Sequence, residues 1–148
     1  MRTGLQPSDL GDLLDRPLNA IVATYLRTGE ASLTPVWHLW DGERFILQFP
    51  AGDRKIDRIR RDPRISILVA ENEHPYRGIE VRGRAEIIAA DYYEAGLKVN
   101  RRYIATYDPT SDEMNYLSRD PGVIVHVHAE RVRAWDYADD DLMPPTEG

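Results

Sequence analysis

A cluster of six basic residues lies between positions 54 and 64 of a chain whose net charge is −6. Asp53 is a typical helix N-cap and Asp62 followed by proline is a typical stop signal, so the segment predicts about two helical turns between them. Ile56 and Ile59 are spaced to face inward together. The segment therefore predicts a short helix with one apolar face and one basic face.

The basic side chains of this helix can project toward solvent or toward an anion near the helix N-terminus. They are Arg54, Lys55, Arg58 and Arg61. One interpretation is a phosphate site. The other is a solvated helix whose charges form intrahelical pairs, such as Asp53 or Asp57 with Arg61. These residues alone leave both interpretations open.

Aromatic residues near a proline form a second feature with possible chemistry. Trp37 and Trp40 follow Pro35 in an apolar, strand-like segment, and Tyr76 and Arg77 come after a later strand. Such residues can form a flat apolar slot for a planar ring, although each one can equally pack in a core. An aromatic slot together with an anion site is what a phosphorylated planar cofactor requires.

Other kinds of active site receive less support. The chain has no cysteine, no nucleophile elbow, no glycine-rich phosphate loop and no zinc-binding helix motif. His38, His126 and His128 can be drawn as a metal triad, because residues two apart share a strand face. Alternating histidines are also typical of a half-exposed strand, and no cysteine or obvious carboxylate completes the set.

Length and charge predict one domain of 148 residues, with a folded part over 1–138 and an acidic, flexible tail over 139–148. Without its last thirteen residues the chain carries 19 basic and 20 acidic side chains. This near-neutral body favours a small anionic ligand over nucleic acid. No apolar run is long enough to span a membrane and the N-terminus lacks a signal-peptide pattern, so we expect a cytoplasmic protein.

The periodicity predicts about six strands and peripheral helices, with Asp41-Gly42 as a hairpin turn. The expected strands are 18–26, 30–40, 44–49, 64–70, 76–89 and 122–135. The expected helices are 8–15, the basic helix, 91–107 and a shorter piece at 111–118. Pro35 is expected at an edge or bulge, and Gly83 at a bend or bulge. Because the helices do not alternate with strands, the pattern predicts a mostly antiparallel α+β β-barrel.

This order of motifs resembles the pyridoxamine 5'-phosphate oxidase-like split β-barrel superfamily. The resemblance covers about residues 18–135 and rests on the segments LNAIVATYL, EASLTPVWHLWDGERFILQF, GDRKIDRIRRDPRISILV and VRGRAEI. More narrowly, the chain is similar to the flavin and deazaflavin oxidoreductases that bind FMN or coenzyme F420. The most specific parts are Lys55 with the turn at 61–63, and the Thr34-Pro35-Val36-Trp37 segment.

The resemblance implies a homodimer with two cofactor sites at the subunit interface, each ring lying against the second strand. The residues expected to line the ring are Ser32, Thr34, Pro35, Val36 and Trp37. Those expected at the phosphate are Arg54 and Lys55, with Arg61 as a further candidate. Tyr76 and Arg77 are expected to approach from the partner subunit. In relatives an arginine often stands two positions before the lysine, whereas this chain has Asp53 there.

The implied activity is hydride transfer between the cofactor and a small planar or conjugated substrate, with neither nucleic acid nor a membrane as partner. Coenzyme F420 is favoured over FMN because the short chain and the lone Lys55 motif look like that branch. His38, Tyr76 or water can serve as proton donor. The alternative is a non-catalytic protein that binds a flavin, a deazaflavin or haem.

Overall fold

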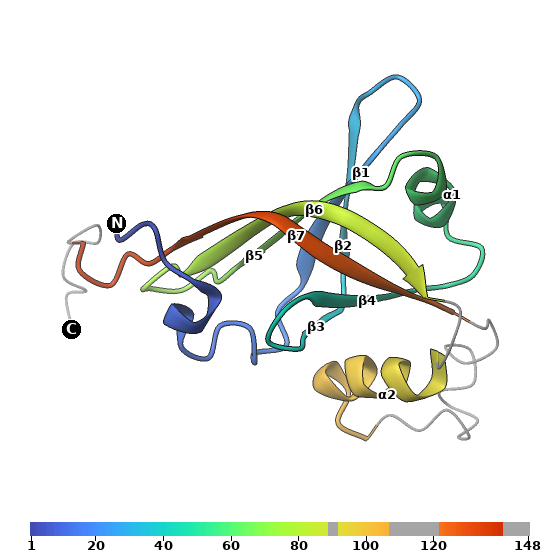
Figure 1. The fold of residues 1–148 in the computed structure, drawn as a ribbon. Helices are drawn as coiled ribbons and strands as arrows, with labels where there is room; N and C mark the ends of the chain where they lie inside the picture. The colour runs from blue at the N-terminus through green and yellow to red at the C-terminus, as the bar shows by residue number, and fades with distance from the viewer. Residues whose placement is uncertain (89–91, 107–121, 141–148) are drawn as a thin grey trace.

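The computed structural model describes residues 1–88, 92–106 and 122–140. Within them, seven strands form one curled antiparallel sheet in the order β2-β1-β5-β6-β7-β4-β3 (Figure 1). The strands are β1 (Ala20–Tyr25), β2 (Ala31–Val36), β3 (His38–Trp40), β4 (Phe45–Phe49), β5 (Arg64–Ala70), β6 (Gly78–Ile88) and β7 (Val123–Trp135). The helices are η1 (Pro7–Leu10, a 3-10 helix), α1 (Arg54–Arg61) and α2 (Tyr92–Tyr103). The predicted α+β split barrel is confirmed.

The sheet has seven strands rather than six because the segment predicted as one strand over 30–40 is divided. β2 pairs with β1, whereas β3 pairs with β4, and Trp37 lies between them outside both strands. The chain changes its strand partner at this corner, which no local periodicity encodes. Pro35 lies on β2 at the edge of the sheet, where its missing N–H can face away from the ladder.

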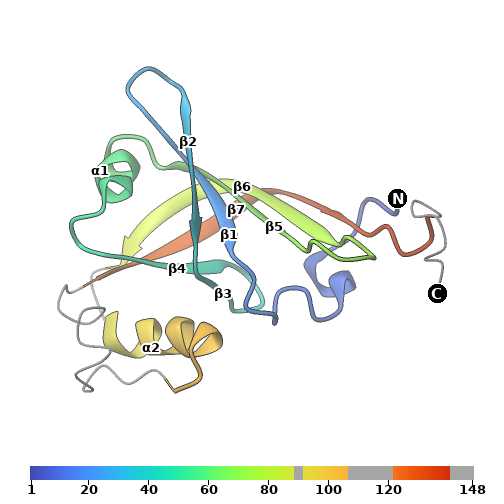
Figure 2. The same ribbon diagram turned by 180° about the vertical axis from the view of Figure 1, so that it is seen from behind.

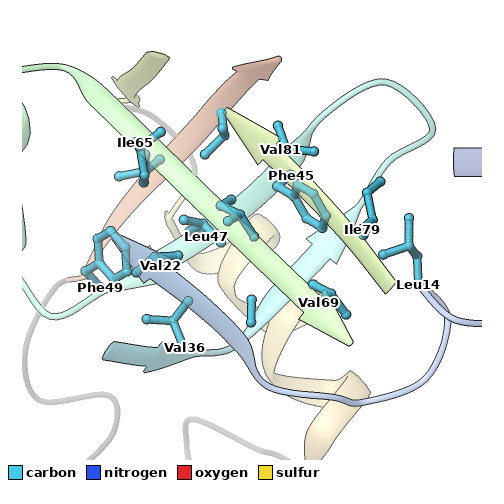
Figure 3. Close-up of a cluster of buried hydrophobic side chains, with 14 of the residues drawn as sticks. Leu14, Val22, Val36, Phe45, Leu47, Phe49, Ile65, Val69, Ile79 and Val81 are labelled. Carbon is cyan, nitrogen blue, oxygen red and sulfur yellow. The ribbon is translucent and has the colours of Figure 1, made fainter. Parts of the chain in front are cut away.

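Apolar side chains on the concave face of the sheet make the core (Figure 3). Phe45 and Leu47 of β4 are fully buried in it with Val81 of β6. Ile56 and Ile59 of α1 are also buried there, so the prediction that they face inward together is confirmed. Their burial fixes α1 against the same core that lies behind β1 and β2.

The N-terminal segment differs from the prediction of a helix over 8–15. Only η1 forms, and the next residue, Gly11, has a φ of +59°, which a continuing right-handed helix cannot accommodate. Leu10, Leu13 and Leu14 are nevertheless buried, as the apolar spacing predicted. The second helix, expected over 91–107, is α2 and ends at Tyr103; the piece at 111–118 lies outside the described residues.

Gly83 lies at the predicted bulge in the long β6–β7 pair. The register shifts between Arg82 and Gly83, and Gly83 faces Ala129 across the pair. A Cβ atom at this position would lie 2.0 Å from the carbonyl oxygen of His128, so only glycine fits this close approach. The bulge lets one long ribbon bend around the core.

At the chain ends, the N-terminal ammonium pairs with Asp140, whereas residues 141–148 lie outside the described part of the chain. The tail boundary therefore stays a prediction. Among the described residues, no helix is both long and apolar enough to cross a bilayer.

Candidate functional site

The edge strand β2 presents a polar row to the concave side of the sheet. Thr34 stands opposite Val22 of β1, and Ser32 stands opposite Thr24. The hydroxyl oxygens of Thr24 and Thr34 are both buried and have no hydrogen-bond partner among the described residues. A buried hydroxyl without a partner costs about 1–3 kcal/mol, so a ligand or water that bonded to this row would be stabilised by a comparable amount. Thr34 and Ser32 were predicted site residues.

Thr24 was not predicted as part of this site. It falls inside the apolar run of the first strand, and its only signal is that it shares parity with Val22. The register that places it opposite Ser32 depends on the β1–β2 pairing, which the sequence did not specify. Three hydroxyl groups on one face of the hairpin are therefore a finding of the structure.

The basic helix α1 begins as predicted at the N-cap Asp53, whose carboxylate accepts a 2.8 Å hydrogen bond from the Lys55 backbone N–H. The Lys55 ammonium does not extend into solvent. It lies 2.9 Å from an Asp53 carboxylate oxygen and 5.1 Å from the centre of the Phe49 ring, and its side chain is only 12% exposed. Lys55 therefore turns back toward the core.

Phe49 connects Lys55 to the strand that carries the hydroxyl row. Its ring belongs to the same buried core cluster as Val22 and Val36 (Figure 3). Val36 is the last residue of β2, and Val22 stands opposite Thr34. Lys55 on α1 and the hydroxyls of β2 thus both border the same buried core cluster.

The other predicted basic residues differ in their surroundings. Arg54 is exposed beside Lys55, whereas Arg61 donates a 2.7 Å hydrogen bond to the carbonyl oxygen of Tyr25. Arg61 therefore fastens the end of α1 to the end of β1. The suggested pairing of Asp57 with Arg61 is not the one seen, because Asp57 lies 4.0 Å from Arg60 instead.

Trp37 forms one wall at the corner between β2 and β3. Its indole stacks on the ring of Tyr103 with a centroid distance of 4.7 Å and an interplanar angle of 4°. Pro35 and Val36 precede it on β2, with Pro35 exposed and Val36 buried. The five residues predicted to line a ring thus lie along one edge of the sheet and its corner.

Tyr76 and Arg77 lie in the β5–β6 turn, at the opposite end of the sheet from α1 (Figures 1 and 2). One chain therefore does not bring them together with Lys55, and their contribution from a partner subunit stays a prediction. Tyr76 has a φ of +54°, a left-handed conformation that costs a non-glycine residue of the order of 1 kcal/mol. Such strain is often found at functional turns.

The Arg77 guanidinium is held within its own chain. It donates two hydrogen bonds to the carboxylate of Glu71, at 2.9 and 2.8 Å, and one of 2.8 Å each to Asp12 and the Leu10 carbonyl. These contacts raise the pKa of Arg77 above its usual value and hold the pKa of Glu71 below its own. Arg77 joins the N-terminal segment to the β5–β6 turn.

The three histidines do not form a metal site. His38 faces Leu47 across the β3–β4 pair, whereas His126 faces the adjacent Ile46, so the two side chains lie on opposite sides of the sheet. His128 pairs with Glu86 on the surface at 3.1 Å. No group of three potential metal ligands occurs among the described residues. The metal interpretation is wrong.

His38 is instead a buried neutral residue. Its ring is fully buried, and neither ring nitrogen has a partner in the described part of the chain. Burial, together with the nearby Arg102 guanidinium, lowers the pKa of His38 from 6.5 to about 4. At neutral pH the His38 imidazole is therefore neutral, and it does not act as an imidazolium acid.

Comparison with known proteins agrees with this fold. Residues 9–136 match the family described as pyridoxamine 5'-phosphate oxidase, and the chain belongs to this family. A search among curated proteins found no match. The predicted resemblance to the split-barrel superfamily of flavin and deazaflavin proteins is confirmed.

Three solved structures illustrate the similarity. The conserved hypothetical protein Rv2991 of Mycobacterium tuberculosis is 26% identical, with a TM-score of 0.77 over 97% of this chain and 92% of that one. A protein described as an F420 reductase is 29% identical, with a TM-score of 0.70 over 86% of this chain and 98% of that one. A FAD-binding protein of Mesorhizobium loti, 20% identical with a TM-score of 0.63 over 90% and 93%, shows the shared fold alone.

Proposed function

We propose that this protein is an oxidoreductase that binds coenzyme F420, or alternatively FMN, and transfers a hydride between that cofactor and a small planar or conjugated substrate. The observation that carries this proposal is the buried hydroxyl of Thr34 on an edge strand, which has no partner among the described residues, while Lys55 packs on Phe49 of the same core cluster. The similarity to an F420 reductase over nearly its whole length supports it.

The residues present fit such a cofactor. A planar flavin or deazaflavin ring has carbonyl and N–H groups along one edge, and β2 offers Ser32, Thr34 and a strand edge that pairs with no other described strand. A phosphate needs a cation, and Lys55 with the exposed Arg54 supplies two. Trp37 adds the apolar wall that a ring requires.

When bound, the cofactor supplies the hydride chemistry itself. The chain then has three tasks. Its β2 hydroxyls orient the ring, Lys55 and Arg54 hold the phosphate, and Trp37 excludes water from one side. His38 is a poor proton donor at neutral pH because its lowered pKa leaves the ring neutral and its burial separates it from solvent. Water or Tyr76 remains as the proton source.

Asp53 distinguishes this phosphate site from one in which an arginine occupies the same position. Its carboxylate already neutralises Lys55 at 2.9 Å, so a phosphate must share or displace that contact. The cofactor therefore gains only the difference between two charge-assisted interactions at Lys55. Arg54, which is exposed on the first turn of the helix, can then carry a larger share of the phosphate contact.

We further propose that the active form is a homodimer. Tyr76 and Arg77 lie at the opposite end of the sheet from Lys55 on α1, so a second copy is the simplest source of them at the phosphate site (Figure 1). Light scattering during size-exclusion chromatography measures the mass in solution. A monomer that still binds the cofactor would contradict this part of the proposal.

The test is a titration of the purified protein with F420 and with FMN, followed by absorbance and fluorescence. Lys55→Ala is expected to raise the Kd of the preferred cofactor by about threefold to tenfold, less than the loss of a full charge-assisted contact, because Asp53 already pairs with Lys55. Arg60→Ala removes the same charge from the exposed face of the same helix and should leave the Kd unchanged. Equal Kd values for wild type and Lys55→Ala would refute the phosphate site.

Turnover separates an enzyme from a protein that only binds the cofactor. The reduced cofactor is mixed with a panel of conjugated carbonyl and nitro compounds, and its reoxidation is followed by absorbance. Acceleration by wild type, weakened in Lys55→Ala, supports the oxidoreductase. Tight cofactor binding without acceleration of any acceptor favours the non-catalytic alternative, and a Soret band in the purified protein indicates haem.

A further inference from the structure

The corner between β2 and β3 is held by α2 rather than by another strand. His38 is the first residue of β3, and both its backbone N–H and its carbonyl oxygen are bonded to side chains of α2. The N–H donates a 3.0 Å hydrogen bond to the hydroxyl of Tyr103, and the carbonyl accepts one from Arg102. The backbone N–H and carbonyl of an edge-strand residue need hydrogen-bond partners, and at His38 the side chains of α2 supply them in place of a neighbouring strand.

Tyr103 makes three contacts that meet at the corner. Its hydroxyl accepts from the His38 N–H and donates a 2.7 Å hydrogen bond to the carbonyl of Leu18, just before β1. Its ring stacks on Trp37 with nearly parallel planes. One side chain therefore fixes the indole, the start of β3 and the entry to β1 relative to each other.

Arg102 extends this connection to the N-terminal segment. Besides the His38 carbonyl, its guanidinium donates to the carbonyl of Leu14 at 2.7 Å and to that of Arg16 at 3.0 Å. Its planar fork can hold several acceptors in a fixed geometry, which a lysine cannot do. One guanidinium therefore bonds to three buried or half-buried carbonyl oxygens, and these bonds join the corner to the N-terminal segment.

We propose that Tyr103 and Arg102 are positioning residues for the cofactor site, because they fix the β2–β3 corner and with it the Trp37 wall. This inference rests on the proposed function. It follows from the position of the corner: Thr34 and Val36 lie on one side of Trp37 in β2, and the bonded His38 lies on the other. If the corner changed conformation, the Trp37 indole and the edge of β2 would move together.

Two variants separate the contacts of Tyr103. Tyr103→Phe keeps the ring against Trp37 but removes the hydroxyl that joins His38 and Leu18, whereas Tyr103→Leu removes both. A looser corner occupies the binding-competent conformation for a smaller fraction of the time, which weakens the apparent affinity by that fraction. We expect the Kd of F420, or of FMN if that is preferred, to rise by about threefold in Tyr103→Phe and about tenfold in Tyr103→Leu.

Two controls separate positioning from general loss of stability. Val81→Ala removes buried volume from β6, a strand that pairs with neither β2 nor β3, and lowers the Tm. Lys98→Gln removes an exposed charge from α2, where Lys98 lies 3.7 Å from Glu94. Both controls should keep the wild-type Kd. The absorbance band of the bound cofactor, which reports the surroundings of its ring, should shift in the Tyr103 variants and in Arg102→Gln only.

The outcomes are distinct. Weaker binding and a shifted band in the corner variants, with both unchanged in Val81→Ala, support the positioning role. If the Tyr103 and Arg102 variants lower the Tm but bind like wild type, the residues are merely structural and the inference is overturned while the proposed function stands. If wild type binds neither F420 nor FMN, the proposed function fails and the positioning role fails with it.

Discussion

The buried imidazole of His38 predicts a specific loss of stability in acid. In the unfolded chain its pKa is 6.5, whereas in the folded chain it is lowered to about 4. Between these values the unfolded state binds more protons than the folded state, so the free energy of unfolding falls as the pH falls from 6.5 to 4. Above pH 6.5 this contribution is fully present.

The size of the effect follows from the same two values. A pKa difference of about 2.5, at about 1.36 kcal/mol per unit, corresponds to roughly 3 kcal/mol lost by pH 4. The steepest slope is about 1.4 kcal/mol per pH unit. His38→Leu removes the titrating group. It also removes two buried nitrogens that lack partners in the described chain, so its stability at pH 7 should equal or exceed that of wild type.

Urea unfolding at several pH values between 7.5 and 4.5 measures this dependence. Protonation of carboxylates whose pKa is lowered by paired arginines, such as Glu71, also lowers the free energy of unfolding in acid. These carboxylates are present in both wild type and His38→Leu. The difference between wild type and His38→Leu therefore isolates the imidazole. His126→Gln, which alters a less buried histidine, is the matched control. Parallel curves for wild type and His38→Leu between pH 6.5 and 5 would refute the reasoning.

Three further changes test other parts of the structure. Gly83→Ala should lower the free energy of unfolding by about 1–3 kcal/mol, because its Cβ would meet the His128 carbonyl at 2.0 Å; an unchanged midpoint in urea would contradict this. Glu71→Gln should cost about 2–3 kcal/mol, because Arg77 loses its buried carboxylate partner and keeps the more exposed Asp12, as measured by Tm at low salt. Asp53→Asn keeps the helix cap but releases Lys55, so cofactor titration should show a lower Kd and thermal melting no change.

The strands, the basic helix and its buried isoleucines were predictable because each depends on local periodicity and on capping residues next to them in sequence. The division of the strand at Trp37 was not, since it depends on which distant strand each half pairs with. A one-dimensional pattern of apolar residues looks the same whether the next residue joins β1 or β4. Partner choice is a property of the whole sheet.

For the candidate site, the sequence predicted the residue types but not the partners of the individual side chains. The type of residue at Lys55 suggested an anion site, but its pairing with Asp53 and its position over Phe49 depend on a rotamer that packing selects. Arg77 looked like a cofactor ligand by type, yet its carboxylate and carbonyl partners come from segments up to 67 residues away. Thr24 carried no distinctive signal at all.

The unpartnered hydroxyl of Thr34 offers the sharpest separation of stability from function. Thr34→Val keeps the branched shape that suits a strand and removes an oxygen that has no partner in the described chain, so the folded state should be as stable as wild type or more stable. If that oxygen serves a bound ring, the same change must weaken cofactor binding, by about threefold to tenfold for one neutral hydrogen bond. Ser66→Ala is a suitable control on the convex face of the sheet.

This combination is informative because ordinary damage lowers stability and binding together. Lys55 enters the complex already paired with Asp53, so its net contribution to binding is reduced, and the ring contacts at β2 must supply a correspondingly larger share of the affinity. Higher Tm with higher Kd in Thr34→Val would support a ligand at the hydroxyl row. Higher Tm with unchanged Kd would show that the row has no part in binding, and the cofactor site would then have to lie elsewhere on the sheet.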